Sequence, residues 1–200
     1  MITKRRPRIL IDVDGVLADF SSGALLVCNK LANTSYTVED IKDFDIFKLP
    51  SLKEIEDEAW RLMDHPGWAR TLKVYDGAKD AVKRLKEIGD VRIVTAAVFS
   101  GPTFCFDRAQ WLEEHFGIVH DDIFFGADKR CVWGDVFIDD KIENIHNWIG
   151  ENGNLPNTPI AILWDRPWNQ NYISHAKVRR LKDWNKAIEL ISTHLSGVTT

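Results

Sequence analysis

The chain has 200 residues, of which 44% are hydrophobic and 28% are charged, and its formal net charge is −4. This length fits one compact domain, or one core with a small insert. Eight Trp and ten Phe residues exclude a chain that is disordered throughout. An acidic balance argues against stable binding to nucleic acid, and the short apolar runs cannot span a membrane. With three scattered cysteines and no apolar stretch of signal-peptide length before Asp12, we expect a cytoplasmic protein.

Apolar runs bounded by polar residues and glycines predict an alternation of strands and helices. Buried strands are expected at 8–13, 91–95, 122–125, 136–138 and 159–163. Amphipathic or apolar helices are expected at 24–31, 52–63, 78–88, 104–116, 142–149 and 184–195. Strands that alternate with helices form a parallel sheet with helices on both faces. The irregular stretch from about residue 20 to 75 interrupts the first crossover, so we interpret it as an inserted cap.

Polar side chains stand where three of these strands end. Asp12 and Asp14 follow the first strand, Thr95 ends the second, and Asp139 with Asp140 ends the fourth. Ligands on such sheets bind at the carboxyl ends of the strands. Carboxylates gathered at one edge repel each other unless a cation lies among them, and hard oxygen ligands suit Mg²⁺. The pattern therefore predicts a Mg²⁺ site at this edge.

A metal beside a carboxylate permits nucleophilic attack on phosphorus. Asp12 is the candidate nucleophile, and Asp14 could protonate the leaving oxygen. Thr95 and Lys129 could hold the phosphate oxygens. Each residue alone has an ordinary explanation: Asp14 and the next glycine as a turn, the other acidic pair as a helix start. The prediction depends on their joint order and strand context.

These residues carry a resemblance to a known superfamily. Residues 9–16 resemble the first motif of the haloacid dehalogenase superfamily of phosphatases, and Val94-Thr95, Lys129 and residues 137–140 resemble its second, third and fourth motifs. Within the superfamily, several segments are similar to the 5′(3′)-deoxyribonucleotidases. These segments are residues 12–20, 66–68, 128–130 and 168–170, and residues 179–181 together with 183–184.

The resemblance implies an α/β fold, a Rossmann-like three-layer parallel sheet core with a small helical cap inserted after the first strand. The core would comprise residues 1–19 and 76–200, and the cap residues 20–75. The implied reaction is the Mg²⁺-dependent hydrolysis of deoxyribonucleoside monophosphates through an aspartyl-phosphate. The resemblance also implies a role for each matching position. Asp12 would be the nucleophile and a metal ligand, and Asp14 the general acid and base and a metal ligand through its carbonyl oxygen. Asp139 would be the third metal ligand, Asp140 would orient its neighbours, and Thr95 and Lys129 would hold the phosphate.

The base pocket follows from the resemblance less closely. Phe20 matches a position where an aromatic ring stacks on the nucleobase, and Trp68 falls near another cap aromatic residue. Phe44, Phe47 and Trp60 are expected to form the interior of the cap. The chain also departs from the family, because Ala96-Ala97 follows the threonine where a second hydroxyl is common.

Two alternatives remain open at this point. One is a phosphatase of the same chemistry that acts on another phosphomonoester, such as a sugar phosphate or a nucleic-acid end. The other is a catalytically silent nucleotide-binding protein. The resemblance also implies a homodimer, and no membrane partner is expected. We interpret the local basic clusters at residues 4–6 and 179–182 as solvated surface.

Overall fold

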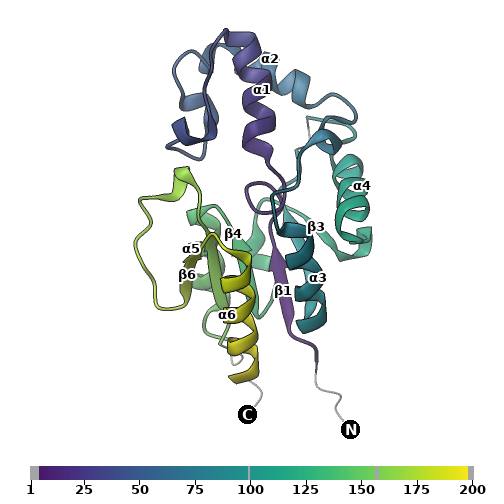
Figure 1. Ribbon diagram of the computed structural model, residues 1–200, viewed down its shortest axis with the longest axis vertical. Helices are drawn as coiled ribbons and strands as arrows, with labels where there is room; N and C mark the ends of the chain where they lie inside the picture. The colour runs from purple at the N-terminus through teal and green to yellow at the C-terminus, as the bar shows by residue number, and fades with distance from the viewer. Residues whose placement is uncertain (1–4, 99, 156–157, 198–200) are drawn as a thin grey trace.

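A six-stranded parallel sheet forms the centre of the computed structural model, which describes residues 5–98, 100–155 and 158–197 (Figure 1). The strand order is β3-β2-β1-β4-β5-β6. The strands are β1 (Arg8–Ile11), β2 (Asp90–Thr95), β3 (Ile123–Phe125), β4 (Val136–Asp139), β5 (Ile160–Trp164) and β6 (Val178–Leu181). All five expected strands are present, and the expected α/β class is confirmed.

Helices cover both faces of the sheet. One face packs against α3 (Ala78–Ile88), α4 (Phe104–Phe116) and α6 (Trp184–Gly197), and the other against α5 (Ile142–Asn152). The central strand β1 shows the consequence, since Ile9 and Ile11 belong to the first apolar cluster and Leu10 to the second. Successive side chains of a strand point to opposite faces. A strand covered on both sides is apolar on both faces, which is why Ile9, Leu10 and Ile11 of β1 show no alternation.

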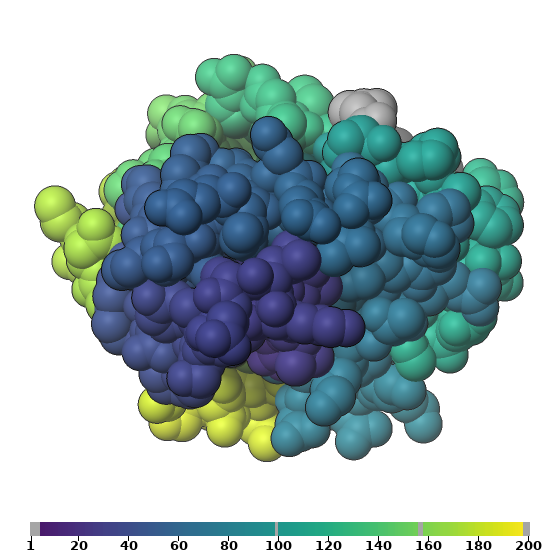
Figure 2. All heavy atoms as spheres, turned by 90° about the horizontal axis from the view of Figure 1, so that it is seen from above, coloured from purple at the N-terminus to yellow at the C-terminus, as the bar shows by residue number. Residues whose placement is uncertain are grey.

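The segment between β1 and α3, residues 20–75, is called the insert below. It contains α1 (Phe20–Ala32), α2 (Glu56–Met63) and several short 3₁₀ turns. Its buried apolar residues form a cluster of their own, among them Ala24, Leu52 and Met63. The insert lies above the carboxyl edge of the sheet (Figure 1), and Figure 2 shows it covering that edge when the molecule is seen from above.

The insert leaves and rejoins the sheet region at one place. The backbone N–H of Asp19 donates to the carbonyl oxygen of Lys73 at 2.8 Å, and that of Tyr75 donates to Leu17 at 2.9 Å. Ala18 and Val74 form an antiparallel bridge between the two crossings. The two ends of the insert are therefore tied side by side.

The strand β6 was not expected from the sequence. It pairs with β5 at the edge of the sheet, and its middle residues are arginines. The guanidinium of Arg180 donates two hydrogen bonds to Oδ1 of Asp165, at 2.8 and 2.5 Å. Arg180 is therefore a partly exposed residue held in an ion pair, whereas Arg179 is exposed. Within the described ranges, no helix is long and apolar enough to cross a membrane.

Candidate active site

The turn after β1 places Asp12 and Asp14 at the carboxyl edge of the sheet. The N–H of Asp12 donates to the carbonyl oxygen of Ile138 on β4 at 2.9 Å, so the sheet itself fixes this residue. The chain then turns back, because the carbonyl oxygen of Val13 accepts the N–H of Ala18 at 2.8 Å. Asp12 is buried, whereas the Asp14 side chain remains about one third exposed at 32%.

Gly15 allows this turn to approach the end of β4. Its φ angle is +75°, a left-handed conformation that glycine adopts without strain. A Cβ atom at this position would lie 2.1 Å from Oδ2 of Asp140. The glycine therefore brings the acidic turn after β1 against the acidic pair that ends β4.

Lys129 lies between two of the carboxylates. It belongs to the short 3₁₀ turn Lys129–Cys131, and its Nζ atom is 2.8 Å from Oδ2 of Asp12 and 2.7 Å from Oδ2 of Asp139. Burial lowers the pKa of Lys129, but the two carboxylates raise it more, so the net shift is upward. The side chain is thus held as a buried ammonium ion.

The two neighbouring aspartates have different surroundings. The oxygens of Asp139 accept hydrogen bonds from Lys129, from the Lys141 N–H at 2.8 Å and from Asn144 Nδ2 at 3.0 and 3.2 Å. Oδ2 of Asp140 accepts from Trp168 Nε1 at 2.9 Å, and no described residue donates to its Oδ1. Both side chains are buried, and burial raises the pKa of each.

Carboxylate oxygens of Asp12, Asp139 and Asp140 all lie within 4.8 Å of one another. One buried ammonium ion cannot neutralise three carboxylates at this spacing. Burial raises the pKa of Asp139 and Asp140, and the neighbouring carboxylates raise it further. Hard oxygen donors crowded in this way are suited to Mg²⁺.

A cavity of about 370 Å³ opens beside the acidic cluster. Its lining includes polar residues from the strand ends and neighbouring turns: Asp12, Asp14, Thr95, Lys129 and Asp140. It also includes aromatic residues, mainly from the insert: Phe20, Phe44, Phe47, Trp60 and Trp168. One cavity therefore presents both metal-compatible carboxylates and aromatic rings.

Most of the residues expected at the site line this cavity, but Trp68 and Asp139 do not. Trp68 packs edge-on against Phe20, with ring centroids 5.6 Å apart and an interplanar angle of 82°. Phe44, Phe47 and Trp60 were expected as interior residues of the insert. Phe47 and Trp60 do pack in its apolar cluster, but for Phe44 the expectation was wrong, because that side chain is 50% exposed. They also form part of the cavity wall, a position that periodicity within the insert could not reveal.

Sequence reasoning also missed Arg108 of α4. Its side chain is fully buried, and its Nη2 atom lies 2.7 and 3.0 Å from the two carboxylate oxygens of Asp14. A signal was available, because Arg108 falls on the apolar face that Phe104, Trp111 and Leu112 define in this helix.

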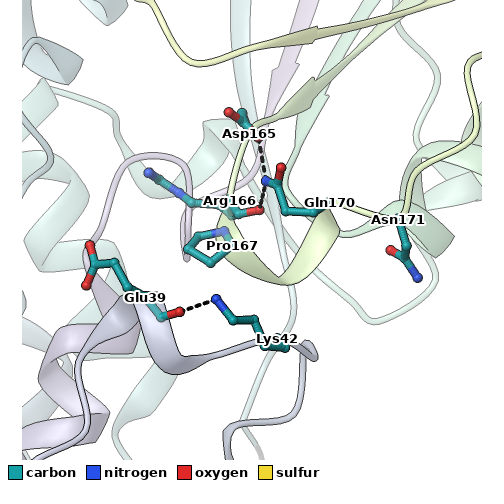
Figure 3. Close-up of a pocket in the computed structure, with 7 residues that line it drawn as sticks. All are labelled: Glu39, Lys42, Asp165, Arg166, Pro167, Gln170 and Asn171. Carbon is teal, nitrogen blue, oxygen red and sulfur yellow. Dashed lines mark hydrogen bonds between the residues drawn. The ribbon is translucent and has the colours of Figure 1, made fainter.

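A second hollow, of about 640 Å³, lies on the seam between the insert and the turn after β5. Figure 3 shows Lys42 donating to the carbonyl oxygen of Glu39, and Gln170 donating to Asp165 and to the carbonyl oxygen of Arg166. None of the residues that line it belongs to the acidic cluster. The hollow is therefore separate from the candidate active site.

Comparison with solved structures identifies the class of fold. A haloacid dehalogenase-like protein of Agrobacterium tumefaciens is 19% identical, with a TM-score of 0.61 over 94% of this chain and 98% of that one. A hydrolase of the same class from Bacillus subtilis, described as bound to magnesium and as showing interdomain movement, is 14% identical, with a TM-score of 0.57 over 94% and 99% of the chains. The fold is that of the haloacid dehalogenase-like hydrolases.

Sequence comparison identifies the family within this class. A 5′(3′)-deoxyribonucleotidase of Bacillus subtilis is 29% identical over 82% of this chain and 87% of its own length. Another of Clostridium acetobutylicum is 26% identical over 91% and 93%. The model of the family described as "5' nucleotidase, deoxy (Pyrimidine), cytosolic type C protein" matches residues 6–196, and the chain belongs to this family. The resemblance seen in the sequence is confirmed, and the chain is a phosphoric monoester hydrolase.

Proposed function

We propose that the chain removes phosphate from deoxyribonucleoside monophosphates through an aspartyl-phosphate on Asp12, with Mg²⁺ as cofactor. The observation that carries this proposal is the cavity itself. Phosphate-compatible groups and aromatic rings line the same cavity, as a molecule that carries both a phosphate and a flat base requires. The names of the bacterial relatives support the same substrate class.

The donor set fits a hard divalent cation. When bound, Mg²⁺ would neutralise the acidic cluster and polarise the phosphate for attack. Asp12, the carbonyl oxygen of Asp14 and one acid of the pair that ends β4 would hold it. The sequence favoured Asp139 for the last position. We propose Asp140 instead, because Asp140 lines the cavity and no residue in the described part of the chain donates to its Oδ1, whereas hydrogen bonds engage both oxygens of Asp139.

In this proposal Asp139 acts by holding Lys129. The Lys129 ammonium is fixed between Asp12 and Asp139 and faces the cavity, where it would attract the phosphate oxygens. The hydroxyl of Thr95 would donate to another of them. Ala96 also lines the cavity and offers no side-chain donor. We therefore expect phosphate binding to depend on Thr95 and Lys129 more heavily than where a second hydroxyl follows the threonine.

The chemical steps then divide between two aspartates. Asp12 attacks phosphorus as the ester bond breaks, and Asp14 gives a proton to the leaving oxygen. Asp14 then takes a proton from the water that hydrolyses the aspartyl-phosphate. Asp14 suits this role because its carboxylate stands at the cavity wall and is partly exposed, so that it can reach both leaving group and water.

The nucleoside would lie against the aromatic side chains that line the cavity. Phe20 begins α1 shortly after the acidic turn, and Phe47 and Trp60 line the same cavity. Base stacking on aromatic rings is tolerant of base identity. Trp68 would support Phe20 from behind through their edge-on contact instead of touching the base.

We further propose that the insert acts as a cap that closes over the phosphate and excludes water until hydrolysis. Its position above the carboxyl edge and the adjacency of its two ends support this motion (Figure 2). Interdomain movement is described for the magnesium-bound hydrolase of Bacillus subtilis. The chain is acidic overall, which argues against stable binding to nucleic acid and agrees with a small-molecule substrate.

The test is phosphate release with Mg²⁺ from a panel of deoxy- and ribonucleoside 5′- and 3′-monophosphates, sugar phosphates and a 5′-phosphorylated oligonucleotide. The Asp12→Asn variant serves as the blank. We expect turnover of the deoxynucleotides, lost in the blank and on chelation of the metal. Turnover of only the other esters would retain the mechanism and refute the substrate. No turnover of any ester would refute the proposal and favour a binding role.

A further inference from the structure

Arg108 forms a buried ion pair with the candidate acid and base of the site. Its guanidinium contacts both oxygens of Asp14 through the single atom Nη2, at 2.7 and 3.0 Å. The Arg108 side chain has no exposed surface, whereas that of Asp14 is 32% exposed. The two residues are 94 positions apart, and α4 brings the arginine to the site from beneath the turn after β1.

The surroundings of Arg108 do not stabilise its charge fully. Its Nε and Nη1 atoms are buried and have no hydrogen-bond partner among the described residues. The rings of Phe104 and Trp111 lie 5.2 and 5.8 Å from its guanidinium carbon. Replacing a whole buried ion pair by apolar residues is often neutral or stabilising. The buried pair of Arg108 and Asp14 is therefore weak evidence for a purely stabilising role.

We propose that Arg108 is a positioning residue that holds the Asp14 carboxyl group in the orientation needed for proton transfer. This inference rests on the role proposed above for Asp14. The contact through one nitrogen fixes the carboxyl group by one edge. Both oxygens of Asp14 accept from Nη2, so the carboxyl group is held in one orientation while it lines the cavity and stays partly exposed.

The first half-reaction shows where this orientation matters. The bond between phosphorus and the ester oxygen breaks, the bond from phosphorus to Asp12 forms, and the proton of Asp14 moves to the ester oxygen. An alkoxide leaving group such as a nucleoside needs that proton. A nitrophenolate leaves without it. Misplacing Asp14 must therefore slow the reaction with a nucleoside leaving group and spare the reaction with a nitrophenolate leaving group.

The experiment is single-turnover kinetics with enzyme in excess, which follows release of the leaving group only. Arg108→Met is compared with the wild-type enzyme on thymidine 5′-monophosphate and on p-nitrophenyl phosphate. We expect the rate on the nucleotide to fall about 100-fold, within the usual range for general acid catalysis, and that on the aryl ester to fall less than about fivefold. The melting temperature should stay unchanged or rise, because Asp14 remains accessible to water and the unpaired donors are removed.

Two further variants separate positioning from packing. Arg108→Lys retains one cation near Asp14 and should recover part of the nucleotide rate. Trp111→Phe disturbs the same buried face, removing the hydrogen bond from Trp111 to the carbonyl oxygen of Leu72, and should affect both substrates equally. Equal losses on both substrates in Arg108→Met would overturn the inference.

Asp14→Asn distinguishes this inference from the proposed function. If Asp14→Asn shows the dependence on leaving group and Arg108→Met does not, the role of Arg108 is wrong and the role of Asp14 stands. If Asp14→Asn itself shows no such dependence, the proposed acid is wrong. When both proposals hold, the double variant should be no slower on the nucleotide than Asp14→Asn alone.

Discussion

Adjacent residues in one strand end can have separate tasks when the chain turns between them. Asp139 ends β4 and points to Lys129 and Asn144, whereas Asp140 points to Trp168 and to the turn that contains Gly15. The first therefore fixes a cation of the protein, and the second remains open to one from solution. The roles that we propose for them follow from this division.

Paired substitutions test this assignment. We expect Asp140→Asn to weaken Mg²⁺ binding at least 10-fold, because it removes a charged ligand. Asp139→Asn should weaken Mg²⁺ binding less and lower kcat more, because it leaves Lys129 with one carboxylate. Isothermal titration with Mg²⁺ and steady-state kinetics measure the two effects. Equal losses of metal affinity in both variants would contradict the assignment.

The residues that sequence reasoning located are those whose place follows from a strand end. Asp12, Thr95 and Asp139 could be expected together because parallel strands deliver their carboxyl ends to one edge. The pairing of Arg108 with Asp14 could not, since the two residues are far apart in the sequence and only the packing of α4 brings them together. The wall formed by Trp60 depends likewise on how the insert folds over the sheet.

At the scale of elements, the junction between insert and core contains its own polar contacts. The hydroxyl of Tyr75 donates to Oδ1 of Asp19 at 3.0 Å, which links the end of the insert to the N-terminus of α1. The guanidinium of Arg166 lies 3.9 Å from the centre of the Tyr75 ring, and its Nε donates to the carbonyl oxygen of Gly15 at 2.6 Å. This junction and the acidic turn are thus connected through Tyr75 and Arg166.

Removing the hydroxyl of Tyr75 should loosen this junction. We expect Tyr75→Phe to lower the free energy of unfolding by about 1 kcal/mol, the typical contribution of one hydrogen bond. The KM for the nucleotide should rise severalfold, because Phe20 follows the released Asp19. Urea denaturation and initial rates measure these effects. Tyr36→Phe is the matched control, since Tyr36 donates to Pro50 inside the insert, and its KM should not change.

The elements themselves were predicted with uneven success. Five strands were expected because they are short apolar runs, and all but the edge strand β3 are buried between two layers of helices. The strand β6 was not predicted, because it lies at the sheet edge. There Arg179 and Arg180 can occupy positions that a central strand fills with apolar residues. The helix α1 begins at Phe20, four residues before the apolar run that predicted it, because Asp19 caps it by accepting from Ser22.

At the scale of the whole molecule, an excess of buried negative charge should make the folded state depend on a cation. A ligand at 100 times its Kd stabilises the folded state by about 2.7 kcal/mol, which for a chain of this size corresponds to about 5–11 °C in melting temperature. We expect Mg²⁺ to raise the melting temperature of the wild-type protein and of Thr95→Ala. Asp140→Asn should respond little at matched ionic strength. A full response in Asp140→Asn would place the cation elsewhere.

The adjacency of the two ends of the insert has a consequence for how such proteins diversify. Because Ala18 and Val74 are bridged, the chain departs from the sheet and returns to it at a single point. A segment attached in this manner can lengthen, shorten or be exchanged for another without altering the order or register of any strand. The sheet core and the insert can therefore change independently of each other in evolution.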